Sequence, residues 1–177
     1  MNILTQMIGF TGTLILLSSL HFQDTKQIFS FQLLGNFLYL IHFFMLGAVT
    51  GNLSVIICIL YDLCLSMNNR FFQGKIIAVV IILLQVVFVV ISWNGPASSL
   101  TAIANISFII AGWTKKPFFV RCACLIIYSP MWMIYDFLAG SFSGVVCEIG
   151  MEISAVISMV NLNCKTRRNP SRSNLSL

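Results

Sequence analysis

The sequence predicts an all-α membrane protein of seven transmembrane helices, because of its composition, the length of its apolar runs and the placement of its charges. Of its 177 residues, 58% are hydrophobic and only 8% are charged, whereas soluble domains carry about 25% charged residues. The apolar runs are continuous and longer than the alternating strands of about 10 residues that form transmembrane barrels. Since about 20 apolar residues in a helix cross a bilayer, we expect helical spans.

Short polar breaks separate seven apolar runs along the chain. The runs lie at 3–20, 31–49, 53–67, 76–93, 100–113, 118–138 and 144–162. The breaks at 50–52 and 139–143 are short and weakly polar, so the apolar pattern does not decide whether each of them separates two helices. The distribution of charge decides it.

All ten basic residues fall on one side of the membrane if every break is a turn between spans. Fusing the second and third spans would place Lys26 opposite Arg70, and fusing the last two would place Lys115 opposite Lys165. Basic residues gather on the cytoplasmic side, so the N-terminus is predicted outside and the C-terminus inside. The basic residues are Lys26, Arg70, Lys75, Lys115, Lys116, Arg121, Lys165, Arg167, Arg168 and Arg172.

An internal repeat with an offset of 93 residues relates the outer ends of two pairs of spans. Ile41–Gly51 aligns without gaps with Ile134–Gly144, and two glycines of each copy coincide. Spans 1–3 are therefore predicted to repeat as spans 5–7. One linking span returns the chain to the same side, so both triplets have the same orientation. The predicted parts are a first three-helix bundle (1–68), a linker helix with its flanking loops (69–98), a second three-helix bundle (99–163) and a disordered, basic cytoplasmic tail (164–177).

The segment Trp132–Glu148 carries a family resemblance. Its sequence WMIYDFLAGSFSGVVCE resembles the signature of the YgjV family of bacterial inner-membrane proteins, and His42–Gly47 is similar to the matching part of the first half. The resemblance implies a multi-pass protein of the bacterial inner (cytoplasmic) membrane. It also implies a relationship to the SWEET, SemiSWEET and PQ-loop proteins, which consist of three-helix bundles and use parallel repeats. The Pro-Gln pair typical of PQ-loop proteins is absent.

Four of the five acidic residues lie within predicted spans. An Asp at mid-helix costs at least about 2.5–3.5 kcal/mol on insertion scales, so such groups tend to face a cavity or the bundle interior. Glu148 and Glu152 are four residues apart on one face of the last span and would titrate as a coupled pair, as proton-coupled transport requires. Alternatively, each carboxyl group bonds a neighbouring helix and only holds the bundle together.

Two further ionisable residues are predicted near the outer surface, and a third near the cytoplasmic one. Asp136 is either a site residue or a carboxylate at the level of the lipid headgroups. His42, at the same depth, pairs with a carboxylate, relays protons or packs as a satisfied side chain. For Asp62, the favoured interpretation is an ion pair with Arg70 or Lys75.

Aromatic and amide side chains complete the set of candidates. Trp132 and Tyr135 could stack on a ring or sugar, and Asn36 and Asn105 could offer hydrogen bonds to a solute; interhelical contact is the alternative for each. Pro130 removes a backbone hydrogen bond in mid-span, so it is a candidate hinge or a passive kink.

These features predict a small-solute transporter with a SWEET-like fold that works by alternating access between two bundles, with protons as the coupling ion. The alternative is a non-transporting sensor or an assembly or partner-binding protein on a carrier-like fold. An enzyme is not expected, because the metalloprotease, hydrolase, Walker and dinucleotide motifs are absent. No cofactor, metal or nucleic acid is expected. The expected partners are membrane lipids, an unknown solute and further copies of the chain.

Overall fold

The computed structural model describes residues 3–19, 21–22, 24–67, 69, 71–114 and 116–168. Within them the chain forms seven helices, as predicted, of which the sixth is a continuous helix made of three consecutive parts. The helices are α1 (Ile3–Ser19), α2 (Thr25–Leu46), α3 (Val49–Ser66), α4 (Lys75–Ile91), α5 (Ala97–Trp113), the continuous α6 (Pro117–Ala123), η1 (Cys124–Tyr128) and α7 (Ser129–Ala139), and α8 (Phe142–Arg168).

Several of these helices suit a membrane by length and composition. Three are long and apolar enough to cross a bilayer, namely Lys26–Leu46, Val49–Ser66 and Phe118–Ala139. The apolar helices α1, α4 and α5 each have 17 residues. A helix of that length is at the lower limit for a span.

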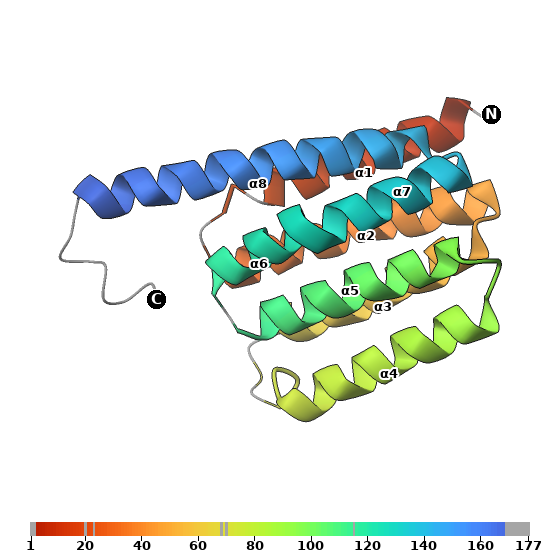
Figure 1. The fold of residues 1–177 in the computed structure, drawn as a ribbon, viewed down its shortest axis with the longest axis horizontal. Helices are drawn as coiled ribbons and strands as arrows, with labels where there is room; N and C mark the ends of the chain where they lie inside the picture. The colour runs from red at the N-terminus through yellow and green to blue at the C-terminus, as the bar shows by residue number, and fades with distance from the viewer. Residues whose placement is uncertain are drawn as a thin grey trace.

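The helices form two layers that enclose an interior. Figure 1 shows α8, α7 and α5 lying over α1, α2 and α3, with α4 at one edge. Contacts join α1 to α2, α2 to α3, α3 to α5, α5 to α7, α7 to α8 and α8 back to α1, so these helices close a ring. Helix α4 packs on α3 and α5 outside that ring.

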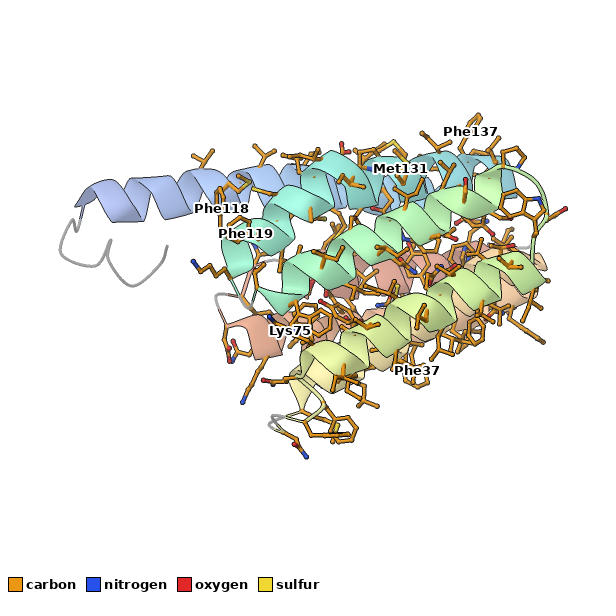
Figure 2. The ribbon with its side chains drawn as sticks, turned by 60° about the horizontal axis from the view of Figure 1, so that its bottom comes forward. Phe37, Lys75, Phe118, Phe119, Met131 and Phe137 are labelled. Carbon is orange, nitrogen blue, oxygen red and sulfur yellow. The ribbon has the colours of Figure 1, made fainter. Side chains whose placement is uncertain are left out.

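Polarity in this protein is inverted relative to a soluble domain. Large apolar side chains such as Phe37, Phe118 and Phe137 project from the outer surface (Figure 2) and are 51%, 47% and 72% exposed. The buried positions instead include amides, hydroxyls and carboxyl groups, among them Asp62 and Gln85. Lipid chains solvate an apolar surface but leave a polar group without a partner, so this arrangement suits a bilayer.

The two turns that the repeat aligns have the same backbone geometry. Gly47, after α2, has φ 71° and ψ 15°, and Gly140, after α7, has φ 73° and ψ 22°. The amide that follows each glycine donates to the carbonyl five positions earlier, at 3.1 Å in the first turn and 2.9 Å in the second. Glycine adopts this left-handed conformation without steric cost, which explains why both copies of the repeat place a glycine there.

The first loop and the C-terminal tail differ from their predicted limits. Asp24 caps α2, its carboxylate accepting a bond from the Lys26 amide at 3.2 Å, so the helix begins before the apolar run does. Helix α8 runs to Arg168 and so extends into the tail 164–177, whose disorder stays a prediction. Basic residues near a helix C-terminus favour this extension through the macrodipole. Residues 169–177 lie outside the described part of the chain.

A π-helical segment precedes the mid-span proline. The Ser129 amide donates to the Cys124 carbonyl, five residues earlier rather than four. Pro130 has no amide hydrogen, and its ring excludes the carbonyl four residues before it, so the wider turn accommodates it. A π-bulge of this kind suits the predicted hinge, which stays a prediction.

The two ends of the ring differ in charge. We call one the turn end: it holds the start of α1, the two glycine turns and Trp93. The other, the basic end, holds Lys75, Lys116 and Arg121, with Trp113 at the end of α5.

The charge difference predicts how the protein lies in its membrane. We expect alkaline phosphatase fused after Gly95, in the α4–α5 loop at the turn end, to be active in bacterial cells, because that end should face outside. The same enzyme fused after Leu177 should be inactive, and green fluorescent protein at that position should fluoresce. Phosphatase activity after Leu177 would contradict this orientation.

Candidate functional site

Two adjoining cavities lie inside the ring. The larger, which we call the basic-end cavity, has an empty volume of about 440 Å³ including its opening, and its lining comes from α1, α2, α3, α5, η1 and α8. The smaller, the turn-end cavity, has an empty volume of about 270 Å³, also including its opening. Leu16, Asn36, Tyr128 and Glu148 line both, so the cavities meet at these residues.

Three buried carboxyl groups line these cavities at different depths. Asp62, Asp136 and Glu148 are 1%, 2% and 7% exposed. With about 1.5 Å of rise per helical residue, Asp136 and Glu148 lie about 6 and 9 Å from the α7–α8 turn. Asp62 lies about 20 Å from the α2–α3 turn by the same reckoning. The carboxyl groups are therefore spread along the ring axis.

Glu148 occupies the junction of the two cavities. Its Oε2 atom is buried without a hydrogen-bond partner. Glu152, one turn further along α8, is half-buried and is not among the residues that line either cavity. Of the predicted pair, only Glu148 is among the residues that line the cavities, and their coupling stays a prediction.

The other two carboxyl groups also face inward. Asp136 lines the turn-end cavity and its Oδ1 has no partner, so the carboxyl is buried within the ring of helices. Asp62 accepts a bond from Asn36 Nδ2 at 2.7 Å. The favoured ion pair of Asp62 with Lys75 is wrong, because Asp62 faces the ring interior while Lys75 is exposed at the start of α4. Arg70 lies outside the described residues.

The side chain of Asn105 joins several helices, and we call this set of contacts the Asn105 junction. All the hydrogen-bonding positions of its amide are used. Its Nδ2 donates to Ser54 O at 3.0 Å and to Gln85 Oε1 at 2.9 Å. Its Oδ1 accepts from Trp132 Nε1 at 3.1 Å and from Cys58 Sγ at 3.4 Å. An amide side chain offers two donors and two acceptor sites, so the geometry favours the interhelical alternative for Asn105.

His42 closes the turn end. Its Nδ1 lies 2.8 Å from Thr5 O and its Nε2 lies 2.9 Å from Ser141 Oγ. A carbonyl only accepts, so Nδ1 donates to it and Nε2 accepts from the hydroxyl. The imidazole of His42 is fully buried, and its hydrogen bonds join α1 and α2 to the α7–α8 turn. Its partners are a carbonyl and hydroxyls rather than a carboxylate, as expected of a satisfied packing residue.

Tyr135, which stands 93 residues after His42, makes the reciprocal contact. Its hydroxyl accepts a bond from the Gly51 amide at 2.7 Å, so α7 reaches the start of α3 as α2 reaches the α7–α8 turn. Tyr39 adds a bond from its hydroxyl to Ser143 O at 3.2 Å. We refer to these contacts of His42, Tyr39 and Tyr135 as the turn-end seam.

Aromatic rings line the turn-end cavity and close the basic end. Phe43 and Trp132 stack with centroids 5.9 Å apart across the ring of helices. Toward the basic end, Phe29 meets Tyr61 and Phe108 edge to face, at 5.5 and 6.2 Å. The Tyr61 hydroxyl donates to Phe108 O at 3.3 Å, which fixes α3 against α5.

Sequence reasoning missed several interior residues. Gln85 is fully buried on α4 and donates to Ser54 Oγ at 3.1 Å, which ties the linker helix to the ring. Its signal was present, because it is the one polar residue in the apolar run 76–91. Tyr61 and Phe43 carried no such signal, because aromatic residues are also common on the lipid-facing surface.

A ring of apolar helices around buried carboxyl groups and interior cavities defines a multi-pass membrane protein. The chain matches the Imp-YgjV family, described as bacterial inner membrane protein, over residues 3–166, and it belongs to that family. It is therefore a protein of the bacterial inner membrane, as the sequence resemblance predicted. No curated protein and no solved structure matches the chain.

The Asn105 junction predicts a large effect on stability. Asn105→Ala should lower the free energy of unfolding by about 2 kcal/mol or more, because it leaves Trp132 Nε1 and Gln85 Oε1 buried without a partner. Circular dichroism during heating in detergent would measure it, with Asn52→Ala, at a half-buried position on α3, as control. Equal melting temperatures for the two variants would show that the junction does not stabilise the ring.

Proposed function

We propose that this protein is a small-solute transporter that works by alternating access and couples transport to protons through Glu148. The observation that supports this most is the position of Glu148, which lies at the junction of two interior cavities with one buried carboxyl oxygen unpartnered. An ionisable group inside a membrane protein is costly and usually marks an ion or solute pathway.

The proposed moving parts are two parallel three-helix bundles, α1–α3 and α5–α8, with α4 as the linker. The contact of α1 with α8 corresponds, in the second bundle, to that of α5 with α3. The two glycine turns match in geometry, and the contacts of His42 and Tyr135 are reciprocal. This pattern is expected of two units related by an axis along the membrane normal, as in SWEET-type carriers.

Residues 93 apart line the same cavity, which supports placing the pathway on that axis. At the turn end, Tyr39 and Trp132 form such a pair, and so do Phe43 and Asp136. In the basic-end cavity, further pairs are Leu16 with Ile109 and Cys58 with Met151. A solute on the axis would contact both bundles, so rocking one against the other would expose it to either side in turn.

The two closures suit the gates of such a cycle. In the proposed orientation, opening outward separates the turn-end seam, where hydrogen bonds of His42 and Tyr135 break. Opening inward separates Phe29, Tyr61 and Phe108 at the basic end. Both sets of contacts are formed in this structure.

Glu148 would carry the proton in this cycle. When the turn end is open, its free oxygen can take a proton from outside, and the neutral carboxyl group crosses the closed state without the cost of a buried charge. After the basic end opens, the proton leaves toward the cytoplasm. Asp136 and Asp62 lie on either side along the axis, where they could pass the proton on.

A second candidate function is that of a non-transporting sensor or assembly protein. One observation favours it: α8 extends past the other helices at the basic end (Figure 1), and it offers a partner in the cytoplasm a helix to bind. This candidate predicts a stable partner in a detergent pull-down and no solute flux.

Purified protein in proteoliposomes would test the transporter proposal. With a pH-sensitive dye inside and a panel of sugars, amines, vitamins and nucleosides outside, we expect one class of solute to cause a proton flux. Glu148→Gln, which keeps the shape but cannot ionise, should abolish that flux. Glu152→Gln should have a smaller effect, because Glu152 does not line either cavity.

The matched control is Asp24→Asn, the same carboxyl-to-amide change at the α2 cap, where asparagine also caps a helix well. It should leave the flux unchanged. Solute uptake that moves no protons in any variant would show that the carboxyl groups are not coupled to transport. No uptake of any solute by folded protein would favour the partner-binding candidate.

A further inference from the structure

We propose that the solute is a small organic cation, an ammonium compound held between aromatic rings and carboxylates in the turn-end cavity and exchanged there for a proton on Glu148. This inference rests on the proposed transporter function, which it makes specific.

The charge of the residues that line the cavities is the first reason to expect a cation. Among the described residues that line the two cavities, the groups that can carry a charge near neutral pH are Asp62, Asp136 and Glu148, and all are acidic. When they are ionised, these groups would repel an anionic solute in a low-dielectric interior. A cation compensates the charge.

The second reason is that two buried carboxyl oxygens lack a hydrogen-bond partner. Asp136 Oδ1 and Glu148 Oε2 are buried in residues that are 2% and 7% exposed, and neither has a hydrogen-bond partner. An ionised carboxylate only accepts hydrogen bonds, and a buried acceptor without a donor is costly. Both residues line the turn-end cavity, so a ligand that brings N–H donors or positive charge would satisfy them.

The third reason is that aromatic rings line the turn-end cavity. Tyr39, Phe43, Tyr128 and Trp132 line the cavity that contains the two carboxyl groups. The faces of such rings attract cations, Trp most strongly, and they recognise quaternary ammonium groups in particular. Phe43 and Asp136 occupy equivalent positions of the repeat, so one bundle offers an aromatic face where the other offers a carboxyl group.

The same arrangement favours an organic cation over a metal ion. Calcium takes six to eight oxygen ligands, and magnesium needs near-ideal octahedral coordination. Here the carboxyl groups are spread along the axis, with Asp136 and Asp62 near different ends, and the other lining residues of the turn-end cavity are aromatic or aliphatic apart from Asn36. Such a lining suits a compact, partly apolar cation.

The proton and the organic cation are exchanged because both would bind to Glu148. A protonated carboxyl group has no charge to offer an ammonium ion, so the proton and the cation exclude each other. One monovalent cation then replaces one proton without net charge movement. The titratable groups that interact with Glu148 or share a cavity with it come from several helices: Asp136 on α7, Tyr128 and Cys124 on η1, Cys58 and Asp62 on α3, Tyr39 on α2, and Cys147 and Glu152 on α8 itself. Arg121, the charged residue of α6, lies at the basic end and donates to Phe22 O.

Binding can be measured through the fluorescence of Trp132. In the variant Trp93→Phe/Trp113→Phe, Trp132 is the remaining tryptophan, and it lines the cavity. The probes are choline, tetramethylammonium and methylammonium, with dimethylbutanol as the uncharged isostere of choline. We expect saturable quenching by at least one cation, and binding of the isostere weaker by at least about tenfold. Lower pH should weaken cation binding, because protons compete for Glu148.

The variant Glu148→Gln should weaken binding of the cation by at least about tenfold, while Asp24→Asn should not change it. The pH competition in protein with Glu148 intact tests the same point if Glu148→Gln does not fold. In proteoliposomes that are acidic inside, uptake of the bound cation should alkalinise the interior.

The outcomes separate this inference from the proposed function. Transport of neutral or anionic solutes with no binding of any ammonium probe would overturn the ligand class and leave the transporter. Binding of a cation without flux of any solute would leave the ligand class and overturn transport. Neither binding nor flux, in protein that circular dichroism shows to be helical, would overturn both. Cation binding independent of pH and of Glu148 would overturn the exchange.

Discussion

A polar group in the hydrocarbon layer has no water to bond, so the polar side chains of these helices have to find one another. The ring arrangement of six helices follows from that constraint, because it provides one interior toward which every helix can turn its few polar residues. Asn105 shows the result, since its amide joins α5 to α3, to η1–α7 and to the outer helix α4 through Gln85. The lipid-facing surface is left to apolar side chains such as Phe37 and Phe137.

The repeat explains how a short chain builds a closed interior with two different walls. Its copies agree where the backbone needs a particular conformation, at Gly47 and Gly140, and differ where side chains face the cavity. Phe43 is replaced by Asp136 in the second copy, and Val55 by Glu148, which stands 93 residues later. At the turn-end cavity, the residues from α1–α3 are therefore uncharged, while both carboxyl groups come from the second copy. This asymmetry gives the cavity a chemistry that two identical bundles would lack.

The contacts at the two ends differ in kind, and this bears on how a carrier of this design would move. The turn end is held by directional hydrogen bonds in which Tyr39 donates and His42 and Tyr135 accept, whereas the basic end closes largely through ring packing of Phe29, Tyr61 and Phe108. The π-bulge before Pro130 lies between these closures, in the helix that contributes Trp132 and Asp136 to the cavity. A change of angle there would move both residues relative to the opposite bundle.

The sequence by itself determined the membrane environment, the number of helices and the repeat, because hydropathy and glycine turns act locally along the chain. It also identified Glu148, Asp136 and Asn36 as interior candidates, since a polar residue in an apolar span is conspicuous. Only the tertiary structure decided which face of each helix meets the cavity. It placed Glu148 but not Glu152 in the cavity lining, and it paired Asp62 with Asn36 instead of a lysine. It also showed that Asn105 and His42 have their bonds already filled. Those outcomes depend on helix rotation and on partners distant in sequence, which no local pattern specifies.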